Sequence, residues 1–161
     1  MDDNDAGGGI PLQQGILIAP EILQKYSLFG GLSSEQIEGI LPYMEYKIFQ
    51  SGEVIMSEGV YNDHVYFILE GRVEVRKNNV ALAELREGDA FGEMELIEVV
   101  PIVATIQALD KVATLSLSNK KLHEIYKKDI STFAMVIMNL ARELSRRLKR
   151  MDAIAVGGNA E

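Results

Sequence analysis

The residues whose types and spacing could do chemistry lie in the segment from Arg86 to Ile97. Gly88 and Gly92 permit tight backbone turns, and the segment also carries two carboxylates, Glu93 and Glu95. A short helix beginning near Glu93 would direct free backbone N–H groups at whatever lies in front of it, which predicts a cradle for an anion. As a general acid and base, the two carboxylates lack a histidine, a nucleophile or a second acid at a helpful spacing. The segment therefore favours binding over catalysis.

The sequence offers few residues for metal binding or thiol chemistry. The two histidines, His64 and His123, are far apart and fall in an expected turn and in a charged expected helix. A metal site of the usual kind needs several such ligands together. The sequence has no cysteine, so it offers no disulfide, no thiolate nucleophile and no Cys-based zinc site. We therefore expect no catalytic residues, no metal and no required cofactor.

Length and composition are those of one ordinary globular domain. The chain has 161 residues, of which 47% are hydrophobic and 25% charged. No apolar run approaches the roughly 20 residues that span a bilayer, and Met1-Asp2-Asp3 lacks the basic start of a secretory signal. We expect a cytoplasmic protein without a membrane span. The formal charge is -8, yet five cations gather near the C-terminus: Arg142, Arg146, Arg147, Lys149 and Arg150.

The N-terminal third predicts an arm followed by two short helices. Residues 1–19 carry acids and a glycine run with little to bury, so we expect a mobile arm there. Pro20 should open a helix through Tyr26. Ser33 and Gln36 have the spacing of a capping box, which predicts a second helix over Glu35–Met44.

The middle of the chain is predicted to be all-β. Short apolar or alternating runs are separated by glycines and by Asn78-Asn79, and such runs must close into a sandwich or roll to bury one face each. The expected strands are Tyr46–Phe49, Val54–Ser57, Val65–Leu69, Val73–Arg76, Val80–Leu85, Thr105–Leu109 and Val112–Leu117. Ser118 is a plausible N-cap for a helix over Lys120–Lys128.

A long amphipathic helix is expected from Ile130, and Gly157-Gly158 should follow its end. Its apolar residues recur at steps of three or four and predict one stripe: Phe133, Ile137, Leu140, Leu144, Leu148 and Met151. The last turns would run beyond a small roll, which favours a two-fold dimer along this stripe. The alternative is a helix folded back on its own core. The domain is expected over residues 20–152, with 153–161 as a flexible tail.

From about Leu28 to Met151 the sequence resembles the cyclic-nucleotide-binding domain of catabolite-activator-like regulators, protein kinase A regulatory subunits and gated channels. The segments that carry the resemblance are Leu28-Phe29, Leu32-Ser33, Gly52–Ile55, Glu58-Gly59, Val65–Val75 and Gly88–Glu93. The resemblance implies a mainly β fold: a β-roll of the jelly-roll type, with about eight strands, flanking helices and a long C-terminal helix. It implies a regulatory sensor in place of an enzyme.

The resemblance fails where the family binds phosphate. The family follows Phe-Gly-Glu with Pro-Arg-Ser/Ala-Ala-Thr, and its arginine pairs with the cyclic phosphate. Here Pro101 is followed by Ile102 and Val103, and Glu95 occupies a place that is usually small. A hydrogen bond to a charged group contributes about 1.5–3 kcal/mol, so an anionic cyclic nucleotide is disfavoured.

Several residues remain candidates for a ligand site. The family's glutamate, here Glu93, accepts hydrogen bonds from ribose; alternatively, Phe91-Gly92-Glu93 only ends a strand and caps a turn. A remodelled pocket would suit an apolar or neutral ligand. Arg147 could reach a phosphate from outside, or be solvated as one charge of a basic run. The candidate set is Val73, Phe91, Gly92, Glu93, Met94, Glu95, Leu96, Ile102, Val103, Ala104 and Arg147.

The leading hypothesis is a non-enzymatic regulatory module that does not bind a cyclic nucleotide through the usual arginine. One alternative is a genuine cAMP or cGMP receptor in which a cation from elsewhere replaces that arginine. A second is a structural adaptor that binds an acidic protein through its basic helix. Direct DNA binding is not expected, because the sequence ends ten residues after Met151 and leaves no room for a helix-turn-helix.

Overall fold

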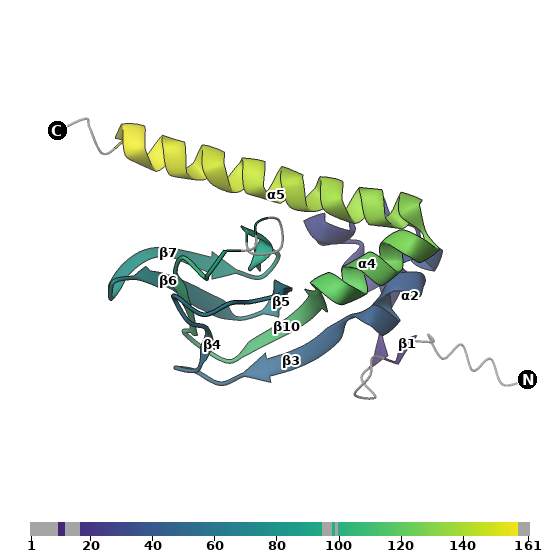
Figure 1. The fold of residues 1–161 in the computed structure, drawn as a ribbon, viewed down its shortest axis with the longest axis horizontal. Helices are drawn as coiled ribbons and strands as arrows, with labels where there is room; N and C mark the ends of the chain where they lie inside the picture. Colours follow the sequence, from purple (N-terminus) through teal and green to yellow (C-terminus); the bar gives the residue numbers. More distant parts are fainter. Residues whose placement is uncertain (1–9, 12–16, 95–97, 99, 158–161) are drawn as a thin grey trace, which may run out of the picture.

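The computed structural model describes residues 10–11, 17–94, 98 and 100–157. Two four-stranded antiparallel sheets form a roll beneath a long C-terminal helix (Figure 1). One sheet has the order β3-β10-β5-β8 and the other β4-β9-β6-β7. This arrangement confirms the predicted β-roll with flanking helices and a long C-terminal helix.

The first sheet consists of β3 (Glu45–Phe49), β10 (Val112–Ser118), β5 (His64–Glu70) and β8 (Ala90–Phe91). The second consists of β4 (Val54–Met56), β9 (Thr105–Ala108), β6 (Arg72–Lys77) and β7 (Val80–Arg86). Seven of these strands match the predicted ones to within two residues at each end. The short strand β8 was not predicted as a strand of its own, because two residues are too few to show a period.

Local sequence explains the hairpin between β6 and β7. Asn78 and Asn79 both have positive φ, 49° and 62°. A two-residue hairpin turn needs two such residues, and asparagine tolerates this conformation better than most side chains. The turn predicted from this pair is confirmed.

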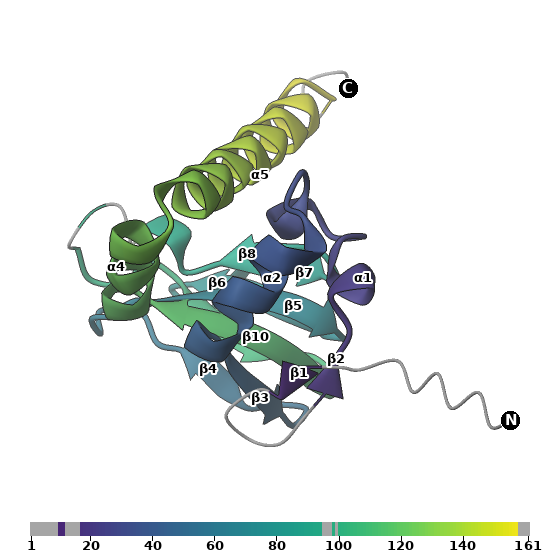
Figure 2. The same cartoon turned by 90° about the vertical axis from the view of Figure 1, so that its right-hand side faces the viewer.

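Helices close one end of the roll (Figure 2). They are α1 (Pro20–Leu23), η1 (Ser27–Phe29), α2 (Ser34–Ile40), η2 (Leu41–Tyr43) and α4 (Asn119–Lys128). The capping box is confirmed, since Ser33 accepts from the backbone of Gln36 and the Gln36 side chain accepts in return. Ser118 caps α4 as predicted. The two N-terminal helices are shorter than expected, and a 3₁₀ turn that contains Pro42 follows α2 directly.

Differences from the expected boundaries lie at both ends. Two short strands, β1 (Ile10–Pro11) and β2 (Leu17–Ile18), pair within the expected arm. Residues 1–9 and 12–16 of that arm lie outside the described residues. The final helix, α5 (Ile130–Gly157), continues past the expected domain limit at residue 152.

The predicted single stripe on α5 is divided in the structure. Leu140 lies in the core and Phe133 and Leu144 are partly buried, whereas Leu148 and Met151 are each 60% exposed. Ile137 is also exposed. The six residues therefore do not form one continuous stripe. The helix has a buried face and, next to it, an exposed apolar face.

Polar residues on the buried face explain why periodicity misplaced it. Asn139 is buried, and its Nδ2 donates to the carbonyls of Leu28 and Gly30, at 2.9 and 2.8 Å. Thr132 accepts a hydrogen bond from Gln36 at 3.0 Å. A count of apolar residues assigns such positions to the solvent side, yet their hydrogen bonds fasten α5 to the N-terminal turns.

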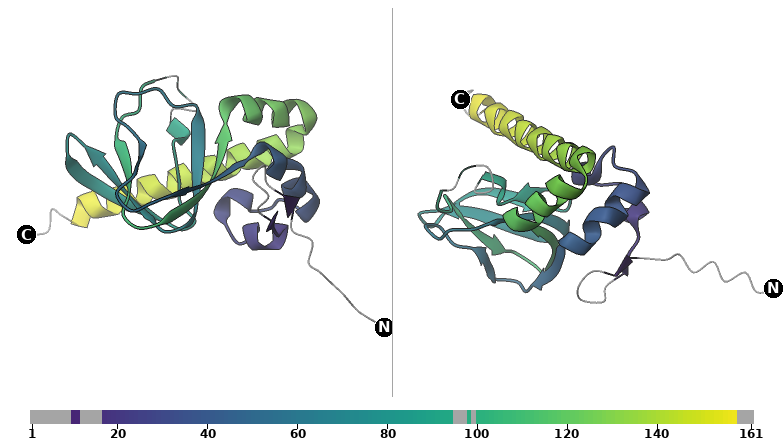
Figure 3. Two further views of the ribbon diagram at one scale, coloured as in Figure 1. Left: turned by 90° about the horizontal axis from the view of Figure 1, so that it is seen from below. Right: turned by 45° about the vertical axis from the view of Figure 1, so that its right-hand side comes forward.

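The hydrophobic core has two parts. One lies between the helices and the first sheet, around Phe29, Phe67 and Leu115. The other fills the roll, around Ile68 and Phe91. Figure 3 shows α5 passing along the roll, outside the two sheets. Among the described helices, none is long and apolar enough to cross a membrane.

Candidate ligand cassette

The predicted cassette begins where β8 ends. Gly92 has φ +81°, and a Cβ built on it would lie 2.5 Å from the His64 carbonyl oxygen. Only glycine fits this close approach without strain. A helix begins at Glu93, as the sequence predicted. Behind the turn, Tyr66 stacks on Phe91 with ring centroids 5.0 Å apart.

The cavity at the cassette is small, about 80 Å³. It is lined by seven of the predicted residues: Phe91, Gly92, Glu93, Met94, Val103, Ala104 and Arg147. Four lining residues were not predicted: Met56, Val75, Leu85 and Ile106. Val75 could have been found, because it lies two positions from Val73 and so on the same face of the strand. A drug-sized ligand needs about 300–1,000 Å³, so this cavity is smaller than a typical small-molecule site.

Two of the candidate residues face the core. Ile102 is 4% exposed and belongs to the same buried cluster as Val73. The backbone of Ile102 pairs with Val60 and Gly59 at 2.9 and 2.8 Å, which fixes the orientation of its side chain. Val103, in contrast, is 41% exposed and lines the cavity. Of the three residues, Val103 lines this cavity, whereas Ile102 and Val73 lie in the buried cluster. Glu95 and Leu96 lie outside the described residues.

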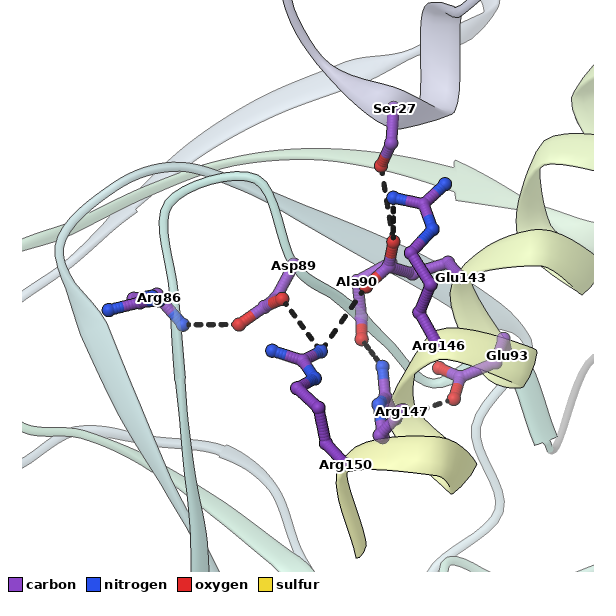
Figure 4. Close-up of polar contacts among 9 residues, drawn as sticks. All are labelled: Ser27, Arg86, Asp89, Ala90, Glu93, Glu143, Arg146, Arg147 and Arg150. Carbon is purple, nitrogen blue, oxygen red and sulfur yellow. Dashed lines mark hydrogen bonds and ion pairs between the residues drawn. The ribbon is translucent and has the colours of Figure 1, made fainter. Parts of the chain in front are cut away.

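The cavity is filled from α5 by Arg147. Its Nη1 lies 2.7 Å from Glu93 Oε1, and its Nη2 donates to the Ala90 carbonyl. The side chain of Glu93 is 3% exposed and that of Arg147 23%. Figure 4 shows the guanidinium between the helix and the cassette. Arg147 therefore enters the cassette and is not solvated as one charge of a basic run.

Further ion pairs surround this contact (Figure 4). Arg150 Nη2 lies 3.4 Å from Asp89 Oδ1 and 3.5 Å from Glu143 Oε1. Arg146 also pairs with Glu143, at 3.2 Å. Asp89 in turn accepts a hydrogen bond from the backbone of Arg86 at 2.9 Å. The C-terminal half of α5 is thus fastened to the turn between β7 and β8 by charge.

Tyr66 and the two histidines each contact a neighbouring side chain. Burial raises the pKa of Tyr66, and the charges of Asp63 and Glu45 raise it further. His64 lies 2.6 Å from Asp63, and His123 stacks on Tyr126. Within the described ranges, no three His, Cys, Asp or Glu side chains are grouped closely enough to hold a metal ion.

Comparison with known proteins agrees with this architecture. Residues 46–129, more than half of the chain, match the profile of the cyclic nucleotide-binding domain. The chain belongs to this family. It is 31% identical over 102 residues to the cAMP-dependent protein kinase regulatory subunit of Debaryomyces hansenii, an alignment that covers 63% of this chain and 23% of the relative.

Two solved structures extend the comparison. The catabolite activator protein of Thermus thermophilus is 27% identical with a TM-score of 0.68, covering 80% of this chain and 61% of that one. The regulatory subunit of a cAMP-independent protein kinase A from Trypanosoma cruzi, bound to guanosine, is 25% identical with a TM-score of 0.57, covering 65% and 38%. This chain therefore spans less than two thirds of the length of each of the three relatives.

Proposed function

We propose that this chain is a non-enzymatic regulatory module whose cassette is closed by Arg147 of α5, and that a ligand enters only when α5 moves. The observation that carries the proposal is the Arg147–Glu93 pair, which fills the cavity at 2.7 Å and leaves about 80 Å³. A ligand that binds only the open state shifts the equilibrium between the two positions of the helix. The signal then leaves the domain through α5.

The ligand we favour is a neutral nucleoside. The place of the family's phosphate-binding arginine holds Ile102, whose side chain packs into the core. An entering anion would also meet the carboxylate of Glu93 as soon as Arg147 departs, and like charges in a poorly solvated site repel. A neutral ribose can still donate its hydroxyl hydrogen to that carboxylate. The guanosine bound by the Trypanosoma cruzi regulatory subunit shows that a relative with this fold takes such a ligand.

A second candidate rests on the same side chain. Arg147 brings a guanidinium to the cassette, and its Nε is buried without a hydrogen-bond partner among the described residues. This guanidinium could leave Glu93 and pair with the phosphate of cAMP or cGMP. Arg147 would then take the role of the phosphate-binding arginine whose place Ile102 holds. The module would then be a cyclic-nucleotide receptor with an atypical clamp.

One calorimetric experiment separates the two candidates. Guanosine, adenosine, cAMP and cGMP are titrated into wild type, Arg147→Met and the control Arg142→Met, which changes an exposed arginine of the same helix. Without the Arg147–Glu93 pair, fewer molecules have the closed cassette that excludes a ligand. The affinity of Arg147→Met for a nucleoside should therefore rise by about 10–100-fold. The control should bind as wild type does.

The opposite result would overturn the proposal. Binding of cAMP by wild type at micromolar concentration, abolished in Arg147→Met, would assign Arg147 to the phosphate and establish the second candidate. Failure of every nucleoside to bind either protein would remove the ligand from the proposal and leave an adaptor that acts through α5.

We further propose that α5 pairs with a second copy of the chain. An exposed or partly exposed apolar face follows alternating steps of four and three: Ile130, Ala134, Ile137, Ala141, Leu144, Leu148 and Met151. This spacing is that of a two-stranded coiled coil. The neighbouring face of α5, which carries Val136 and Leu140, packs against the chain's own core. A helix that only folds back on its own core therefore explains that face but leaves the exposed apolar face unexplained.

Light scattering tests the dimer. Leu148→Asp places a charge on the exposed face with little effect on the monomer core, because Leu148 is exposed in the single chain. It should convert a dimer into a monomer. Ala153→Asp, an exposed alanine off this face, is the matched control and should remain dimeric. A monomeric mass for wild type would refute the proposal.

A further inference from the structure

A second and larger cavity lies beside the cassette, on the other side of the Arg150–Asp89 contact. Its volume is about 590 Å³, within the range of small-molecule sites. It is open to solvent, and it is bordered by the segment from Lys25 to Ser27, the turn between β7 and β8, and the C-terminal half of α5. None of the residues that line the cassette cavity lines this one.

The lining is rich in cations. Its lining contains five basic residues, Lys25, Arg86, Arg146, Lys149 and Arg150, and three acidic ones, Glu87, Asp89 and Glu143. The carboxylates of Asp89 and Glu143 are already bound by Arg146 and Arg150. Glu87 accepts a hydrogen bond from the Tyr26 hydroxyl at 3.0 Å. Asp89 and Glu143 are therefore paired with cations, whereas the Tyr26 hydroxyl leaves the negative charge of Glu87 in place.

Three of the cations have no counter-ion. Within the part of the chain that the structure describes, Lys25, Arg86 and Lys149 make no side-chain ion pair. They come from three separate elements, and the overall charge of the chain is -8. Uncompensated cations that converge on one cavity in an acidic protein create a local positive potential, which concentrates anions there.

We infer that this cavity binds a small anion that carries several charged groups, phosphates or carboxylates. Three cations spread over three elements are best satisfied by a ligand with more than one anionic group, whereas a single phosphate ion fills little of the volume. Such a ligand bridges α5 to the turn between β7 and β8 and to the segment after α1. Because it holds these elements together, it stabilises the folded domain.

Calorimetry at constant ionic strength tests this inference. Inorganic tripolyphosphate, citrate and inorganic phosphate are titrated into wild type, Lys25→Glu, Lys149→Glu and the control Lys127→Glu. All three lysines are exposed, and Lys127, on α4, does not line the cavity. Each cavity variant should weaken tripolyphosphate or citrate binding by about tenfold, because it removes one attraction and adds a repulsion. The control should stay within about twofold of wild type.

The comparison among anions identifies the chemistry. Tighter binding of tripolyphosphate than of citrate assigns the site to phosphates, and the reverse assigns it to carboxylates. Binding of inorganic phosphate as tight as that of tripolyphosphate would overturn the inference of a multivalent ligand. Absence of saturable binding, or equal weakening by Lys127→Glu, would overturn the site itself. None of these outcomes depends on whether the cassette binds a nucleoside.

Discussion

Replacement of Arg147 by methionine should destabilise the domain, although methionine keeps an apolar side-chain stem at this position. In the native structure the guanidinium compensates Glu93, whose side chain is 3% exposed, and satisfies the Ala90 carbonyl. Removing one partner of a buried ion pair costs about 3–5 kcal/mol. Because Arg147 itself is 23% exposed, solvent screens part of this interaction, and we expect about 2–3 kcal/mol.

A double-mutant cycle isolates the pair from the packing around it. Glu93→Gln removes the carboxylate charge, and Glu93→Gln with Arg147→Met removes both partners. The double variant should lose about 1–2 kcal/mol less than the sum of the two single losses, which is the coupling expected for residues in contact. Urea unfolding at pH 7 measures each free energy of unfolding.

The control for this cycle is Lys149→Met. Lys149 is exposed on the same helix and forms no ion pair among the described side chains, so its replacement should change stability by no more than about 0.5 kcal/mol. The cycle is repeated in 1 M salt, where an exposed pair weakens and a buried pair changes little. Single losses that add within about 0.3 kcal/mol would show that Arg147 and Glu93 are not coupled, and the closed cassette would lose its physical basis.

Contacts of Asn139, Gly92 and Asp110 give three further predictions. Asn139→Ala removes two hydrogen bonds to the backbone of the η1 turn and should cost about 2–3 kcal/mol in urea unfolding, with faster amide exchange at residues 27–31. Gly92→Ala forces a Cβ to 2.5 Å from a carbonyl oxygen and should cost more than about 2 kcal/mol, whereas Gly59→Ala, at a similar φ but with nothing within 4 Å, should cost about 1 kcal/mol. Hydrogen bonds from Arg72 lower the pKa of Asp110, so its contribution to stability is present above the unfolded pKa and is lost as the pH falls through the folded value. Asp110→Asn should therefore reduce stability near pH 7 and match wild type near pH 2, and an equal loss at both would contradict this assignment.

Local sequence was sufficient for most of the framework. Three local features could be predicted because each depends on residues within a few positions of one another. They are the turn at Asn78-Asn79, the capping box at Ser33 and the N-cap at Ser118. The alternation of apolar and polar residues predicted the strands for the same reason, since it too depends on neighbouring residues. The closure of these strands into a roll then follows from the need to bury one face of each sheet.

The state of the cassette was decided by tertiary contacts. Arg147 and Glu93 are 54 residues apart, and nothing local distinguishes Arg147 from the other cations of its helix. The direction of the Ile102 side chain is set by backbone pairing with Val60, and the burial of Asn139 by carbonyls more than 100 residues away. Sequence periodicity reports which residues prefer to be buried, but a polar side chain is buried only where folding supplies its partner. The amino-acid sequence alone thus determined the roll and showed Ile102 after Pro101, and only the folded chain placed Arg147 in the cassette.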